Sequence, residues 1–293
     1  MTQEQKGFCF CTLALGKSYR ALASLLAEDL EKYAPETSFI VLTDNPLDFS
    51  RHSNVIAFKH RQQSVKCYHD KRFVIAKALS LFNSCIFIDA DMRILAPVTQ
   101  DMKWIIEPGI AARACDSMEN KYAQVITGSA KPKGFRELKV TQAIAQKLNL
   151  DLKDNRLKFV YEYLFAVTKD CGKEIEFLKH WEIIAPYFEL NGVYDGEGNA
   201  IGLAAAKAGL KVRWSDMEGI AFFKDRTELV RIQKGQSNIN KMSIYFEQQK
   251  MLEQPKRSIL EKVAVKIGKN ISYFYHSVHL VIVTLRRFNF YYR

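Results

Sequence analysis

The stretch "NSCIFIDADMRILAP", residues 83–97, decides the fold. An apolar run, Cys85 to Ile88, leads directly into two aspartates, Asp89 and Asp91, which are separated only by Ala90. In an extended segment, residues two apart point to the same side, so both carboxylates are expected to project together beyond the strand end. Two carboxylates this close repel each other unless a positive charge lies between them. The stretch therefore predicts a buried strand that ends at a cation site.

In the residues before this stretch, expected strands alternate with expected helices, as in an α/β protein. Apolar strands are expected at Phe8–Leu15, Phe39–Leu42 and Val55–Phe58, and helices at about Ser18–Tyr33 and Tyr68–Phe82. Alternating strands and helices predict an open, mostly parallel, Rossmann-like sheet flanked by helices. Ligands bind such sheets beyond the carboxyl ends of the strands. Asp44, which follows the second strand, is therefore expected near the aspartate pair.

The pattern after Pro97 is less regular. We expect a strand in "PGIAARACD", a helix near Val140–Leu150, a strand over Phe159–Val167 with Glu162 in its middle, and a helix over Ile175–Phe188. A glycine-rich turn, an alanine-rich helix and a final strand follow in "LNGVYDGEGNAIGLAAAKAGLKVRW". The spacing of its glycines, G-x-G-x-x-x-G late in the chain, does not match a dinucleotide-binding fingerprint.

The positive charge is concentrated at the carboxyl end. The 293-residue chain has a net charge of +11, and residues 256–293 hold eight Lys or Arg side chains against one acid, Glu261. A general nucleic-acid binder is therefore not expected, because the remaining domain, 1–255, is only slightly basic. The tail combines basic and aromatic residues. A short basic helix is expected over Lys256–Lys269, and the uncharged run after it, 270–285, is shorter than the roughly 17–25 residues of a membrane span. This composition predicts a helix lying on a membrane surface. A helix that completes the domain, or a dimer interface, is the alternative, so an oligomer remains possible.

The six cysteines form no CxxC pair, and the amino-terminal stretch "MTQEQKGFCFCTLALGK" lacks the pattern of a signal peptide. Reduced cysteines and the absence of an export signal predict a cytoplasmic protein, peripheral at the inner face of the membrane.

"CIFIDADMRIL", preceded by the basic helix "YHDKRFVIAKALSLF", resembles the GT-A glycosyltransferases, above all the glycogenin-like and blood-group-transferase-like branches. The resemblance covers roughly residues 7–215. It implies that Asp89 and Asp91 hold Mn²⁺ or Mg²⁺ together with the ribose and diphosphate of a UDP- or GDP-sugar. It also implies that Asp44 lies near the base or ribose, and that Arg72 and Lys77 reach the nucleotide sugar. Both basic residues are surface charges on the alternative interpretation.

"YDGEGNAIG" resembles the segment in which these transferases place an acidic residue near the donor sugar or the acceptor. Asp195 and Glu197 are the resulting candidates for a catalytic carboxylate, as base, nucleophile or stabiliser of an oxocarbenium-like centre. A turn that caps the following helix is the alternative. The resemblance favours a retaining hexosyltransferase acting on an acceptor hydroxyl. The basic tail fits an acceptor at the membrane, such as a lipid-linked or cell-surface glycan.

The sequence departs from the family at the third metal ligand, which several related transferases supply from a late histidine. Here no histidine lies between His180 and His276, so Asp216 or Asp225 could replace it. Three nearby basic residues could instead meet the diphosphate; these are Lys224, Arg226 and Lys234.

Two other functions remain open from the sequence. Phosphatases of the haloacid-dehalogenase type also have an apolar strand before a DxD motif, but they usually carry Thr or Val where this chain has Arg93, and their motif opens the domain. The second alternative is a catalytically inactive scaffold at the membrane surface.

Overall fold

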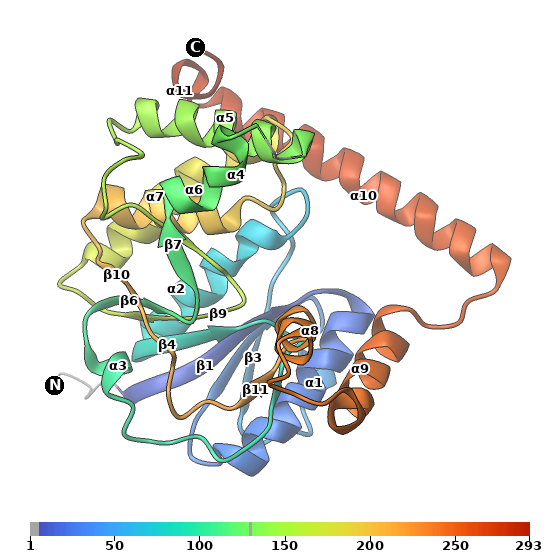
Figure 1. Ribbon diagram of the computed structural model, residues 1–293. Coiled ribbons are helices and arrows are strands. Elements are labelled where there is room, and N and C mark those ends of the chain that lie inside the picture. Colours follow the sequence, from blue (N-terminus) through green and yellow to red (C-terminus); the bar gives the residue numbers. More distant parts are fainter. Residues whose placement is uncertain (1–5, 129–130) are drawn as a thin grey trace, which may run out of the picture.

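A seven-stranded sheet in the order β10-β6-β9-β4-β1-β2-β3 forms the centre of the computed structural model, which describes residues 6–128 and 131–293 (Figure 1). Its strands are β1 (Lys6–Ala14), β2 (Phe39–Thr43), β3 (Val55–Lys59), β4 (Phe82–Ile88), β6 (Gly109–Ala112), β9 (Leu164–Thr168) and β10 (Val212–Trp214). Strands β3, β2, β1 and β4 are parallel to one another, whereas β9 is antiparallel to both β4 and β6. The predicted α/β fold with a mostly parallel sheet is confirmed. Residues 1–5 of the expected domain, 1–255, lie outside the described residues.

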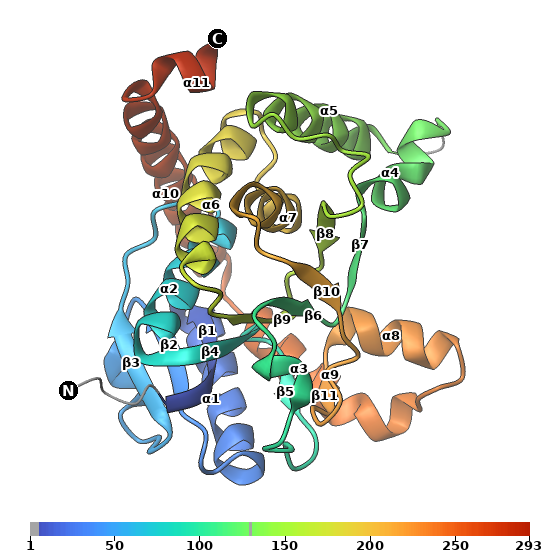
Figure 2. The same ribbon diagram turned by 90° about the vertical axis from the view of Figure 1, so that its left-hand side faces the viewer.

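Helices cover both faces of this sheet (Figure 2). They are α1 (Gly16–Tyr33), α2 (Lys71–Leu81), α3 (Lys103–Ile106), α4 (Met118–Ile126), α5 (Pro132–Lys147), α6 (Lys173–Leu190), α7 (Glu197–Ala208), α8 (Asp225–Gln233), α9 (Ile239–Glu253), α10 (Ile259–Leu285) and α11 (Phe288–Tyr292), with short 3₁₀ helices η1 (Pro46–Phe49) and η2 (Tyr68–Asp70). Helix α1 packs on one face, and α2, α6 and α7 pack on the other. The two layers give two separate hydrophobic cores.

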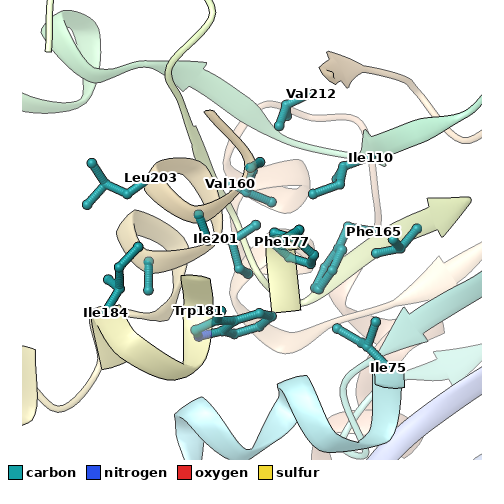
Figure 3. Close-up of a cluster of buried hydrophobic side chains, with 14 of the residues drawn as sticks. Ile75, Ile110, Val160, Phe165, Phe177, Trp181, Ile184, Ile201, Leu203 and Val212 are labelled. Atoms are coloured by element: carbon teal, nitrogen blue, oxygen red, sulfur yellow. The ribbon is translucent and has the colours of Figure 1, made fainter. Parts of the chain in front are cut away.

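The larger core lies under α2, α6 and α7 (Figure 3). Trp181 of α6 is fully buried there, and its indole Nε1 donates a hydrogen bond to Nδ1 of His69 at 3.2 Å. Phe165 of β9 stacks on Phe87 of β4 with ring centroids 5.4 Å apart. These contacts fix α2 and α6 against the strand that carries the aspartate pair.

Glycines bring α7 unusually close to the two-stranded sheet of β7 (Cys115–Ser117) and β8 (Lys158–Val160). A Cβ atom added at Gly202 would lie 1.7 Å from the carbonyl oxygen of Lys158, and one at Gly198 would lie 2.4 Å from that of Val160. No other residue fits at such distances. The glycines of "YDGEGNAIG" therefore serve helix packing, which sets the position of Glu197 at the start of α7.

Two expectations about the elements were wrong, and the structure contains further elements that were not expected. The strand expected over Phe159–Val167 is interrupted between β8 and β9, and Glu162 lies in the connection. Between β10 and the tail lie β11 (Phe222–Phe223) and helices α8 and α9, none of which was expected; β11 pairs with β5 (Arg93–Ile94), which follows β4. In the tail, a short basic helix followed by an apolar run was expected, but a single helix, α10, runs through both, and the short helix α11 follows it.

Helix α10 extends away from the rest of the chain over its first half (Figure 1). Ile259 and Leu260 are 80% and 82% exposed. The second half packs on α6 through a buried face that contains Leu280 and Thr284. None of the helices in the described part of the chain combines the length and the apolar character that a membrane span requires.

Candidate active site

The two aspartates of the opening stretch lie in a tight turn at the carboxyl end of β4. The turn is fixed at both ends of Asp89, because its N–H donates to the carbonyl of Tyr163 and its carbonyl accepts from the N–H of Met92, each at 3.0 Å. Although this segment is a turn and not an extension of the strand, the two carboxylates still converge. The ammonium of Lys224 lies 3.3 Å from Asp89 and 2.5 Å from Asp91. The positive charge beside both carboxylates is the ammonium of Lys224.

A second lysine, Lys71, occupies the centre of the site. Its Nζ lies 3.0 Å from Oδ1 of Asp89 and 3.4 Å from Oε1 of Glu197, and it donates to the carbonyl of Glu162 at 3.3 Å. The residue is only 7% exposed. Burial opposes its positive charge, but the carboxylates of Asp89 and Glu197 outweigh burial and raise the pKa of Lys71. Lys71 therefore stays charged and joins the aspartate pair to α7.

Asp70 fixes the start of the helix that carries Lys71. Its buried carboxylate accepts hydrogen bonds from the backbone N–H groups of Gln63 and Ser64, at 2.8 and 2.9 Å, and lies 2.9 Å from Nε2 of His60. Burial alone would raise the pKa of Asp70, but these hydrogen bonds outweigh it and lower the pKa. An ionised, fully bonded carboxylate holds the loop and the first turn of α2 in one position.

Lys224 reaches the site from the far end of the sequence. It directly follows β11, whose Phe223 pairs with Arg93 of β5. The guanidinium of Arg93 forms two hydrogen bonds to Asp29 of α1, at 2.6 and 2.8 Å. This bidentate pair anchors β5, and β5 in turn positions β11 and the ammonium of Lys224 above the aspartates.

Glu197, at the first position of α7, is almost completely buried. Its Oε1 faces Lys71, whereas Oε2 has no hydrogen-bond partner among the described residues. Burial raises the pKa of the Glu197 carboxyl to about 8; Lys71 opposes this increase, and the charge of Glu162 adds to it. The site thus contains one carboxyl that changes its charge near neutral pH.

The two aspartates differ in their electrostatics. Burial would raise the pKa of Asp89, but the charges of Lys71 and Lys224 outweigh burial and lower it. At Asp91 burial dominates and, together with the charge of Asp89, raises the pKa despite Lys224. Asp89 is therefore the firmly ionised member of the pair. A cation is needed to keep Asp91 ionised beside it.

Two half-exposed tyrosines flank this group. Burial and the charge of Asp91 raise the pKa of Tyr19 to about 12, and burial and the charge of Glu197 raise the pKa of Tyr68. Tyr19 is 47% exposed and Tyr68 is 41% exposed. Their rings offer apolar faces to a ligand that enters from solvent.

The structure brings Asp89, Asp91 and Glu197 together but places the other candidates elsewhere. Asp44 ends β2, two strands from β4, where its carboxylate accepts from the N–H of Gly16 at 3.0 Å and pairs with Arg20 at 2.6 Å. Asp195 is half-exposed and forms an ion pair with Lys133. Of the two candidate catalytic carboxyls, only Glu197 contacts a residue that also holds Asp89.

The assignment of Arg72 and Lys77 to the nucleotide site is not supported by their positions. Arg72 donates to the carbonyl of His69 at 2.9 Å, and its guanidinium lies 4.1 Å from the ring centroid of Phe73. Lys77 lies over the ring of Phe58 at 4.2 Å. Neither contacts the aspartates, because successive residues of a helix point in different directions. The contact belongs instead to Lys71, the residue before Arg72.

The carboxylates fit a divalent cation, since hard cations prefer carboxylate oxygens and complete their coordination with phosphate and water. The Lys224 ammonium marks the point at which the oxygens of Asp89 and Asp91 converge. No group of three or more His, Cys, Asp or Glu side chains that could hold a metal is present among residues 6–128 and 131–293. Of the suggested third ligands, Asp225 lies near enough to raise the pKa of Asp91, whereas the carboxylate of Asp216 accepts from the N–H of Glu218.

A scan against protein-family models and a search of the curated proteins found no match to this chain. The interpretation of the site therefore depends on its own geometry. That geometry consists of two converging aspartates, two charged lysines and one buried carboxyl with an unpaired oxygen.

Proposed function

We propose that this protein is a GT-A-type glycosyltransferase that moves a hexose from a UDP- or GDP-sugar to an acceptor hydroxyl. One observation carries the proposal: Asp89 and Asp91 converge beyond the carboxyl end of β4, with Lys71 and Lys224 directly beside them. This edge of a parallel sheet is where nucleotides bind. The two carboxylates would bind the metal ion, and the two buried ammonium groups would bind the negatively charged diphosphate.

The two lysines and Glu197 would have different roles in the transfer. Lys71 and Lys224 are positioned to bind the diphosphate and to stabilise the negative charge that builds up on it as it leaves. Glu197 would act on the sugar or on the acceptor hydroxyl, as base, nucleophile or stabiliser of the oxocarbenium-like centre, and all three roles require its ionised form. Transfer with retention is proposed from the resemblance alone.

We propose Mn²⁺ or Mg²⁺ as the cofactor, held by Asp89 and Asp91. The cation would neutralise charge on the leaving diphosphate. Its entry requires the ammonium of Lys224 to leave the carboxylates, because the two cations would occupy the same point. Lys224 would then be free to contact the diphosphate.

Calorimetric titration of UDP and of GDP, with and without Mn²⁺, tests the donor site. The wild type is expected to bind one of the two nucleotides only with Mn²⁺, and Asp91→Asn is expected to lose this binding by about 100-fold, since a metal ligand is removed. Asp101→Asn, at an exposed position in the following loop, is the matched control and should bind as the wild type does.

Failure of both nucleotides to bind the folded wild type would contradict the proposal and favour the inactive scaffold. Release of phosphate from simple phosphate esters, dependent on Mg²⁺ but not on a sugar nucleotide, would favour the phosphatase. The place of the aspartates speaks against that function, because they follow the fourth strand along the chain and not the first.

We further propose a cytoplasmic location, peripheral at the inner face of the membrane, with α10 as the contact. Its apolar side chains Val263, Ile267, Ile271 and Phe274 are each at least half exposed. Basic residues lie on the same helix. Helix α10 therefore offers apolar side chains to the interior of a bilayer and positive charge to its anionic headgroups.

The triple variant Lys262→Glu, Lys266→Glu, Lys269→Glu is expected to lower binding to vesicles that contain phosphatidylglycerol by about 100-fold or more, since each Lys near an anionic surface contributes roughly 1 kcal/mol. Cosedimentation measures the effect. The same reversal at Lys139, Lys153 and Lys211, all exposed on the main body, is the control. An equal loss of vesicle binding in both triple variants would show that the attraction is non-specific. A dimer detected by light scattering without vesicles would favour the alternative that the tail is a dimer interface.

A further inference from the structure

A cavity of about 360 Å³ opens beside the candidate donor site. Three segments form its walls: the start of α5 with Lys133 and Arg136, the turn before α7 with Tyr194 and Asp195, and the loop of Lys66 and Tyr68. Two of its lining residues are close in the chain to residues of the donor site: Tyr68 precedes Lys71 by three residues, and Asp195 precedes Glu197 by two. The cavity therefore lies on the side of the donor site that carries Lys71 and Glu197.

The cavity has an excess of unpaired positive charge. Lys133 is paired with Asp195. The carboxylate of Glu137 lies 3.9 Å from the ammonium of Lys121 and accepts a hydrogen bond from the amide of Asn199 at 2.7 Å. Lys66 and Arg136 have no ion-pair partner among residues 6–128 and 131–293; the ammonium of Lys66 lies 4.8 Å from the ring centroid of Tyr194. A guanidinium and an ammonium directed at one cavity match a phosphate group.

The wall of the cavity is joined to the helix with the exposed apolar face. The hydroxyl of Tyr194 lies 2.7 Å from that of Tyr273 in α10, and the two rings make an edge-on contact with centroids 5.9 Å apart. Phe274, the next residue of α10, is 71% exposed. The contact therefore holds the middle of α10, whose exposed apolar residues include Ile271 and Phe274, against the wall of the cationic cavity.

We infer that this cavity binds the phosphate group of a lipid-linked acceptor, whose hydrocarbon chain follows the exposed side of α10. This rests on the proposed glycosyltransferase function, which it deepens by naming the class of acceptor. Lys66 and Arg136 bind the phosphate, and the sugar or hydroxyl beyond it extends past Tyr68 to Glu197. Charge and apolar surface are adjacent, as a phosphate next to a lipid chain requires.

Calorimetric titration without metal separates the lipid from free phosphate as the source of the ligand. The probes are dihexanoyl phosphatidic acid, below its micelle concentration, and inorganic phosphate. The wild type is expected to bind the lipid at least about tenfold more tightly than inorganic phosphate, because only the lipid also covers apolar surface. The double variant Lys66→Met, Arg136→Met should lose about 10- to 100-fold in affinity for the lipid. Lys139→Met, exposed on the same helix as Arg136, is the control and should bind the lipid as the wild type does.

Three results would overturn the inference: no binding of the lipid, equal affinity for lipid and inorganic phosphate, or a double variant that binds the lipid as the wild type does. Titration of the same proteins with UDP and GDP in Mn²⁺ distinguishes the two levels of the proposal. Nucleotide binding without lipid binding would reject the acceptor cavity alone. Lipid binding that depends on Lys66 and Arg136, without nucleotide binding, would support the cavity and reject the donor site.

Discussion

Glu197→Gln is expected to lower kcat by about 10²- to 10⁴-fold, the range that removal of a general acid–base group produces. The amide keeps the size of the side chain but cannot carry the negative charge that each of its three possible roles needs. Glu197 is selected over Asp195 because it is buried, contacts Lys71 at 3.4 Å and has an unpaired Oε2. Asp195→Asn is the comparison, and its effect should be less than about tenfold. Larger loss in Asp195→Asn than in Glu197→Gln would reverse the assignment.

The pH dependence gives this prediction a second readout. With a pKa of about 8 for Glu197, kcat/KM of the wild type should rise with pH and level off above about 8. Asp195 cannot produce such a profile, because its ion pair with Lys133 outweighs its burial and lowers its pKa. A wild-type profile that is flat between pH 6 and 9 would exclude Glu197 as the titrating group.

Stability should follow the same group with the opposite trend. The pKa of Glu197 is higher in the folded protein than the ordinary value of about 4.5, so between these two values the folded state binds more protons than the unfolded state. The free energy of unfolding therefore falls as pH rises from about 4.5 to about 8. Glu197→Gln lacks this loss and should be the more stable protein at pH 9, by a difference on the order of 5 kcal/mol. Urea unfolding at pH 5 and pH 9 measures it.

The sequence was sufficient for the sheet and for the aspartate pair, because both depend on local patterns. An apolar run followed by Asp89 and Asp91 defines the end of β4, and the alternation of strands and helices before it defines a mostly parallel sheet. The break between β8 and β9 was missed because "FVYEYLFAV" is apolar or aromatic except for Glu162 and contains no Gly, Pro, Asn or Asp that would signal a turn. Helix α10 was divided in the prediction because its composition changes from basic to apolar, although helical geometry does not change there.

Of the two lysines at the candidate site, only Lys71 carried a signal in the local sequence pattern that could have identified it. Lys71 lies one turn before Ile75 on the buried stripe of α2, so a charged residue on an apolar stripe was a usable signal; the resemblance directed attention to Arg72 instead. Lys224 had no such signal. Its position depends on the pairing of β5 with β11, two strands of two residues each that lie far apart in the sequence. Pairing of such short strands is a product of tertiary packing, which no local pattern reports.

Lys224→Met is expected to destabilise the metal-free protein by about 3–5 kcal/mol. The side chain is only 12% exposed and neutralises Asp89 and Asp91 together, so its loss leaves two close carboxylates without their shared cation. Methionine fills a similar volume, which restricts the change to charge. Urea unfolding in the presence of a chelator measures the effect. Lys234→Met, at the exposed end of α8, is the control and should change stability by less than about 0.5 kcal/mol.

Mn²⁺ should restore much of the stability that Lys224→Met loses, because the metal can take the place of the ammonium between the carboxylates. A ligand that binds only the folded state adds about 2.7 kcal/mol at a concentration 100 times its Kd. The wild type should gain less than the variant at the same Mn²⁺ concentration, since its own lysine must first be displaced. Equal stabilisation of both proteins would mean that the metal binds somewhere else. A variant that stays destabilised in Mn²⁺ would show that Asp89 and Asp91 pair with the two lysines and hold no metal. The positive charge that neutralises the diphosphate would then have to come from Lys71 and Lys224.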